Sequence, residues 1–139
     1  MASNYGANQY KQMSVLTASR GKILLLLYEA AIQNVKKATF YLDKKDLAQK
    51  GVHIVKTHDI INELTNSLNF EMGGDIAREL ERLYNFMTEQ LVKANLENSK
   101  AALESVRKNL ETLYSGWKTA VEQVEKGNAP NGSNIPSSK

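Results

Sequence analysis

Apolar residues recur every three or four positions over four long stretches of this 139-residue chain, residues 20–42, 47–68, 76–94 and 99–124. This spacing places them on one face of an α-helix, and each stretch is long enough for several turns. No stretch alternates apolar and polar residues with a period of two, so no β-strand is predicted. The pattern therefore predicts an all-α protein.

Capping residues, glycines and prolines set the boundaries of these helices. Asp46 is expected to cap the second helix, and Asn98 or Ser99 the fourth, because short polar side chains accept hydrogen bonds from free backbone amides. Residues 69–74 contain two adjacent glycines, which should separate the second helix from the third. Both prolines lie within the last ten residues. Four helices joined by short connections predict an antiparallel up-down four-helix bundle.

Two further segments flank the predicted bundle. Residues 1–19 have no helical period of their own, and residues 127–139 read GNAPNGSNIPSSK. The latter sequence is too polar to bury the apolar surface that would order it. We therefore expect an N-terminal strap over residues 1–19, a bundle over residues 20–126 and a disordered tail over residues 127–139.

The segment KILLLLYEA, residues 22–30, is more apolar than a helix with one buried face requires. Leu24 to Leu27 sweep about 300° around a helix axis, so they cannot all face one core. A large exposed apolar patch on a soluble protein usually marks a binding surface. We expect the strap to cover part of this surface with Tyr10, Val15 and Leu16.

Charge, hydropathy and cysteine content argue against several kinds of protein. The net charge is only +3, and no basic stripe is interleaved with aromatic residues, so the sequence does not indicate nucleic-acid binding. The apolar run at residues 23–28 is six residues long, far below the roughly 20 that cross a bilayer. The chain has neither a secretory signal pattern at its start nor a cysteine. A cytoplasmic location without membrane insertion is therefore expected.

The sequence offers little for catalysis. His53 and His58 are five positions apart, whereas two metal ligands on one helix face need a spacing of three or four. No glycine-rich phosphate-binding motif is present. We therefore expect no enzymatic activity, no metal and no cofactor.

One segment leaves a signalling alternative open. HIVKT, residues 53–57, resembles the HxLKG motif of histidine phosphotransfer domains, which are also four-helix bundles. In that interpretation an exposed His53 accepts a phosphoryl group and Lys56 helps to hold it. Thr57 stands where the motif has glycine.

Three blocks together resemble the flagellin-specific secretion chaperones, the FliS family. The first is Tyr10 followed by TAS at 17–19 and KILLLLYEAAI at 22–32. The second is KTHDIINELTNSLNFEMGGDIARELERLYNFM at 56–87, and the third is Ala94-Asn95 with Trp117 in the last helix. The family usually has proline and glutamate where this chain has Arg20 and Gly21, so the start of the first helix is expected to fray or shift.

The resemblance implies a cytoplasmic chaperone that binds the disordered C-terminal segment of flagellin. Such a chaperone prevents premature polymerisation and delivers flagellin to the flagellar export apparatus, while the bound segment folds into helices around the bundle. The expected contacts are the positions that match the family's apolar and aromatic motifs, together with the strap. They are Leu27, Tyr28, Ile60, Leu64, Leu83, Tyr84 and Met87, with Tyr10, Val15 and Leu16 from the strap.

Overall fold

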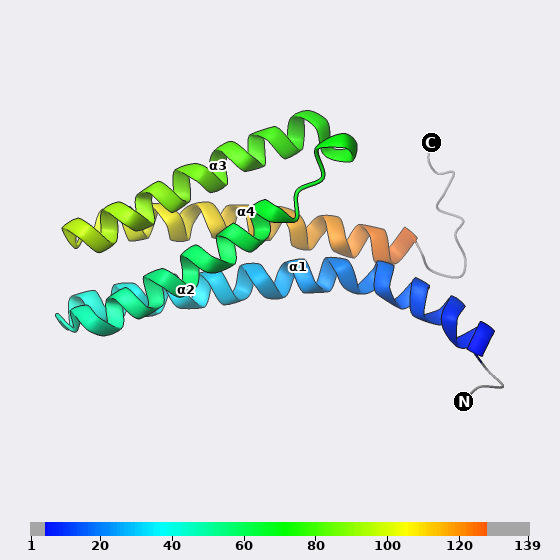
Figure 1. The fold of residues 1–139 in the computed structure, drawn as a ribbon, viewed down its shortest axis with the longest axis horizontal. Helices are drawn as coiled ribbons and strands as arrows, with labels where there is room; N and C mark the ends of the chain where they lie inside the picture. Colours follow the sequence, from blue (N-terminus) through cyan, green and yellow to red (C-terminus); the bar gives the residue numbers. More distant parts are fainter. Residues whose placement is uncertain (1–4, 128–139) are drawn as a thin grey trace.

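Four helices make up the described part of the protein. The structure, a computed structural model, describes the backbone of residues 5–127 and the side chains of residues 20–127. The helices are α1 (Tyr5–Asp43), α2 (Leu47–Asn66), α3 (Phe70–Glu97) and α4 (Lys100–Gly127). Each helix packs against the next, and α4 packs back on α1, so antiparallel neighbours form a ring (Figure 1). The prediction of four helices is confirmed, and residues 5–127 contain no strand.

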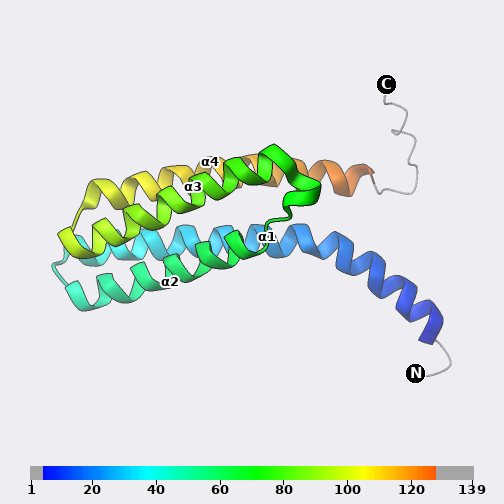
Figure 2. The same ribbon diagram turned by 45° about the horizontal axis from the view of Figure 1, so that its top comes forward.

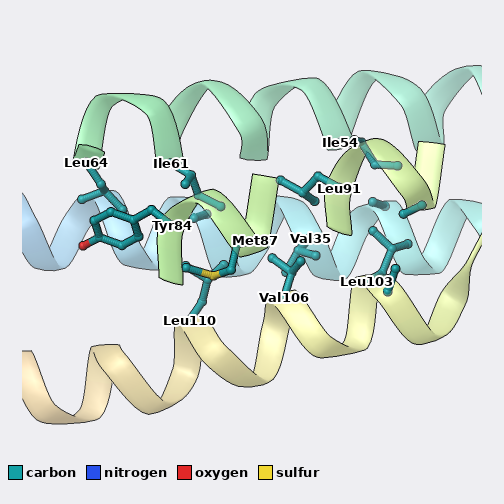
Figure 3. Close-up of a cluster of buried hydrophobic side chains, with 14 of the residues drawn as sticks. Val35, Ile54, Ile61, Leu64, Tyr84, Met87, Leu91, Leu103, Val106 and Leu110 are labelled. Atoms are coloured by element: carbon teal, nitrogen blue, oxygen red, sulfur yellow. The ribbon is translucent and has the colours of Figure 1, made fainter. Parts of the chain in front are cut away.

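The core lies along the axis of this ring and draws side chains from all four helices (Figure 3). Burying one such side chain contributes roughly 1.5–3 kcal/mol. Most residues at the predicted 3-4 spacing are buried or half-buried, whereas Leu47, Ile76 and Val124, near helix ends, are at least half exposed. The core includes Ala31, Val35 and Ala38 from α1, Ile54 and Ile61 from α2, Met87 and Leu91 from α3, and Leu103, Val106 and Leu110 from α4.

The first helix is longer than predicted. It begins at Tyr5 instead of after Ser19, and its first turns extend beyond the ends of the other helices (Figures 1 and 2). Extending a helix that the bundle already holds costs far less than nucleating a new one. The side chains of residues 5–19 and all of residues 1–4 and 128–139 lie outside the described part. The contacts of Tyr10, Val15 and Leu16 and the disorder of the tail therefore stay predictions.

Gly21 lies inside α1 and brings α1 close to α4. Of the two expected outcomes, a frayed or a shifted helix start, the structure shows the shift, because α1 passes continuously through Arg20 and Gly21 and starts at Tyr5. A Cβ atom at Gly21 would lie 2.9 Å from Cγ2 of Val121, which is closer than real Cβ contacts allow. The missing side chain thus lets Val121 of α4 pack directly on the α1 backbone.

Polar side chains cap the helices largely as predicted. Asp46 Oδ1 accepts a hydrogen bond from the Gln49 amide at 3.1 Å, and Ser99 Oγ accepts one from Ala102 at 3.1 Å. Asn98 instead ends α3 in the left-handed conformation. The expected break at the paired glycines is a kink within α3, at Gly74 with φ 51° and ψ −123°. The first turn of α3 is thereby set at an angle to the rest (Figure 2).

A buried lysine fixes the C-terminal end of α3. Lys50 of α2 is only 3% exposed, and its Nζ donates to the Asn95 carbonyl at 3.0 Å and to Asn98 Oδ1 at 2.5 Å. The last carbonyls of a helix carry a partial negative charge and lack partners within the helix. The ammonium group therefore satisfies these acceptors and sets the position of α2 against α3.

A second buried polar group, His53, lies between α1 and α2. Its ring stacks on Tyr41, with centroids 5.5 Å apart, and its Nδ1 lies 2.9 Å from Asn34 Oδ1. Asn34 Nδ2 donates to the Ala30 carbonyl, so Oδ1 is the acceptor and His53 Nδ1 carries the proton. Burial, reinforced by the charges of Lys56 and Lys37, lowers the pKa of His53 from its usual value, so the ring is neutral at pH 7.

We predict opposite effects for alanine at two helical glycines. Gly74→Ala should destabilise the protein by about 1–3 kcal/mol, because a side chain disfavours the backbone conformation of Gly74. Beyond the chain neighbours and the local helix backbone, no heavy atom lies within 4 Å of an added Cβ at either Gly74 or Gly116, so a clash contributes to neither result. Gly116→Ala, in regular helix, should stabilise by about 0.5–1 kcal/mol. Urea unfolding monitored by circular dichroism measures both, and equal effects would contradict the kink.

We also predict that His53 makes stability depend on pH. Because its pKa is lower in the folded protein, the unfolded chain takes up the proton first as the pH falls through about 6.5. The contribution of His53 to the free energy of unfolding is thus fully present above that pH and is lost as the pH falls below it. The melting temperature should fall between about pH 7.5 and pH 5.5, and less steeply in His53→Gln. His58→Gln is the control and should keep the wild-type slope; equal slopes in all three proteins would refute the assignment.

Candidate functional site

Apolar surface lies open on both sides of α3. On one side, a groove of about 570 Å³ runs between α3 and α4, and we call it the α3–α4 groove. Its apolar lining comes from Ile76, Leu80, Leu83 and Phe86 of α3 and Leu113 of α4. These α3 positions are separated by three or four residues, so one helix face forms the floor.

Charged residues border the α3–α4 groove without entering its floor. Asp75, Glu79 and Arg82 complete its lining. Glu79 accepts a hydrogen bond from Arg82 at 2.5 Å, and Asp75 pairs with Arg78 one turn earlier. Such exposed ion pairs contribute little to stability. An apolar floor with a charged rim instead matches the usual arrangement of a protein-binding interface.

A second cavity continues the α3–α4 groove around the start of α3. This end pocket, of about 340 Å³, shares Ile76 and Leu80 with the α3–α4 groove and is otherwise lined mainly by apolar side chains. Met72, in the turn before the Gly74 kink, lies at its rim and is 85% exposed. Together the two form one apolar trough. The other apolar and aromatic lining residues of the end pocket are Leu24, Leu64, Leu68, Ala77, Tyr84 and Trp117.

A third groove, of about 270 Å³, lies on the opposite side of α3, next to α2. We call it the α2–α3 groove. Val55 of α2 and Val92 of α3 line it and are about half exposed, while Leu96 is 79% exposed. Both flanks of α3 therefore offer apolar surface.

A hydrogen-bonded group of aromatic residues lies below the end pocket. The Tyr28 and Tyr84 hydroxyls bond to each other across the core, and Trp117 Nε1 donates to the Tyr28 hydroxyl at 3.1 Å. The group links α1, α3 and α4. Burial raises the pKa of both tyrosines, so both hydroxyls stay neutral at physiological pH.

The structure divides the predicted contact residues into two sets. Tyr28, Leu64, Tyr84 and Met87 are at most 1% exposed and belong to the core, although Leu64 and Tyr84 also line the end pocket. Leu27, Ile60 and Leu83 are half-buried against that core. Among these three, Leu83 lines the α3–α4 groove. Direct contact of any of these residues with a partner stays a prediction.

Several residues of the apolar surfaces beside α3 were missed by sequence reasoning. Phe86, Val92 and Leu96 fall outside the core stripe of α3, and their exposure follows from how α3 packs between its neighbours. Ile76 was assigned to the core stripe and is 69% exposed. The signal that could have found them is the width of the apolar face of α3, which exceeds what one core requires.

The structure contradicts the phosphotransfer alternative. A phosphoryl acceptor must be exposed, whereas His53 is 8% exposed, stacked on Tyr41 and bonded to Asn34. Residues 20–127 also contain no group of three His, Cys, Asp or Glu side chains arranged to hold a metal. No helix among the described residues is long and apolar enough to cross a membrane.

Comparisons with known proteins agree with this architecture. A solved structure described as a flagellar chaperone from bacteria has the same fold, with a TM-score of 0.74 at 22% identity over 86% of this chain and 97% of that one. The flagellar secretion chaperone FliS of Salmonella typhimurium is 34% identical over 118 residues, which cover 81% of this chain and 87% of the relative.

Proteins from other bacteria are also similar to this chain. The flagellar secretion chaperone FliSB of Pseudomonas aeruginosa is 33% identical over 113 residues, 78% of this chain and 90% of the relative. The Bacillus subtilis FliS is 28% identical over 117 residues, 84% of this chain and 86% of the relative. The family model described as flagellar protein FliS matches residues 1–124. The chain therefore belongs to the FliS family of flagellar secretion chaperones.

Proposed function

We propose that this chain is a non-catalytic, cytoplasmic export chaperone for flagellin. In this proposal it binds the disordered C-terminal segment of flagellin, prevents that segment from polymerising prematurely, and delivers the subunit to the flagellar export apparatus. The observation that carries the proposal is the apolar trough formed by the α3–α4 groove and the end pocket.

The trough suits an amphipathic helix. Ile76, Leu83 and Phe86 form a row on one helix face, and Leu113 closes the row from α4. A partner helix that places apolar residues at positions i, i+3 or i+4, and i+7 can fill such a row. The charged rim supplies exposed Asp75, Glu79 and Arg82, which favour a partner with a polar outer face.

The presence of two separate apolar surfaces beside α3 also favours a disordered partner. The α2–α3 groove lies across α3 from the trough, and an extended chain could occupy both sides. A segment that folds on binding spends part of the interaction free energy on ordering and in return covers a large surface. Masking of this kind requires no nucleotide hydrolysis and no cofactor.

The first test of this proposal targets the floor of the trough. Phe86→Asp should weaken binding of the flagellin C-terminal segment at least tenfold, about 1.4 kcal/mol, because it places a charge against an apolar partner. Phe40→Asp is the matched control, because Phe40 is also a half-exposed phenylalanine on a helix but lies on α1. It should bind within about twofold of wild type. Isothermal titration calorimetry measures both affinities, and equal losses would contradict a binding site beside α3.

The second test separates core residues from contact residues. Tyr84→Phe removes one hydroxyl of the buried pair and should lower stability by about 1–3 kcal/mol, since the Tyr28 hydroxyl loses a partner. Flagellin affinity should remain within about twofold, because the ring still fills its place. Thermal unfolding and calorimetry report the two quantities. A large loss of affinity with unchanged stability would instead make Tyr84 a direct contact.

A further inference from the structure

The face of α1 that points away from the bundle combines exposed apolar and basic side chains. Seven residues of α1 and of the turn that follows it, from position 23 to position 44, are spaced by alternating steps of three and four and therefore share one side of the helix. We call this set the outward stripe: Ile23, Leu26, Ala30, Gln33, Lys37, Phe40 and Lys44.

The large apolar residues of the outward stripe project into solvent. Leu26 is 61% exposed, and Ile23 and Phe40 are each 53% exposed. They span about 25 Å along the helix axis. Lys44 lies beside the last of them, with its Nζ 5.5 Å from the centre of the Phe40 ring. These residues do not line the trough or the α2–α3 groove.

The outward stripe contains two lysines, Lys37 and Lys44, and no acidic residue. Residues 20–45 contain six basic and two acidic residues. Both acids are engaged toward α4, since Glu29 accepts a hydrogen bond from Tyr114 at 2.6 Å and Asp43 lies 3.1 Å from Lys100 Nζ. Lys37 and Lys44 have no carboxylate within 4.0 Å among the described side chains.

The opposite side of the molecule has the opposite charge. α3 lies across the ring from α1 (Figure 1) and contains three basic and six acidic residues. The bundle is thus electrically polar, with the positive side on α1 and the negative side beside the trough. An extended negative surface would therefore orient the molecule with α1 toward it.

We propose that the outward stripe docks this chaperone on the surface of an anionic lipid bilayer. Ile23, Leu26 and Phe40 enter the boundary between headgroups and acyl chains, while the lysines contact lipid phosphates. The orientation keeps α3 and the trough facing away from the membrane, where a bound segment remains accessible.

The shape of the stripe favours a lipid surface over an acidic protein. A protein helix docks in a groove that surrounds its apolar side chains. The outward stripe is instead a ridge, because its apolar residues are more than half exposed. A bilayer surface can deform around separate projecting side chains and needs no matching groove.

Vesicle flotation with the full-length protein tests this inference. The protein should float with vesicles of phosphatidylcholine and phosphatidylglycerol, should not float with phosphatidylcholine alone, and should be released by high salt. Lys37→Glu/Lys44→Glu should reduce partitioning at least tenfold, because each reversal removes an attraction and adds a repulsion. The matched control is Lys93→Glu/Lys108→Glu, which changes the net charge equally at exposed sites on α3 and α4 and should stay within about twofold.

Two substitutions of exposed leucines complete the flotation experiment. Leu26→Ser should weaken flotation severalfold, whereas Leu96→Ser, at an exposed leucine of α3, should not. Absence of flotation with the anionic vesicles, or equal losses in both lysine variants, would overturn the inference. Binding of polyglutamate without binding of vesicles would also overturn it and would assign the stripe to an acidic protein. Lys37→Glu/Lys44→Glu and Leu26→Ser should keep the wild-type flagellin affinity, so failure of the proposed function would register separately.

Discussion

The arrangement of this bundle depends on how α3 is held. Two directional contacts fix it: the Tyr84 hydroxyl bonds to Tyr28 across the core, and the carbonyl end of α3 receives the Lys50 ammonium group. Both contacts are buried, where hydrogen bonds are strong and unpaired groups are costly. Because these contacts and the core stripe position α3, its two flanks do not need to be covered. The apolar surfaces beside α3 can therefore stay open in a folded protein.

Local sequence signals predicted the helices well, because a 3-4 apolar period, a capping aspartate and paired glycines act within a few residues. They failed at the start of α1, where residues 5–19 have no apolar period but continue a helix that the bundle holds. The candidate site was less predictable. Periodicity shows which face of α3 is apolar but not which part of a wide face is covered by α2 or α4. Tyr28 and Tyr84 illustrate the problem, because they were expected to contact a partner, whereas the pairing of their hydroxyls allows both to be buried.

Glycine has two different physical roles among the described residues, and at a third position it has neither. At Gly21 its missing Cβ gives Val121 room, at Gly74 its backbone freedom permits the kink, and at Gly116 it has neither role. Composition alone cannot distinguish these cases. Of these positions, Gly21 and Gly74 shape the molecule. Gly21 lets α4 pack closely on α1, and the kink at Gly74 positions the turn at the rim of the end pocket.

Trp117 gives the protein an intrinsic optical reporter. It is the only tryptophan in the chain, it lines the end pocket, and its indole nitrogen is bonded to Tyr28. The emission of an indole ring shifts to shorter wavelength when water leaves its surroundings. A ligand that fills the end pocket would thus be visible without any attached dye, and a ligand confined to the α2–α3 groove would leave the emission unchanged.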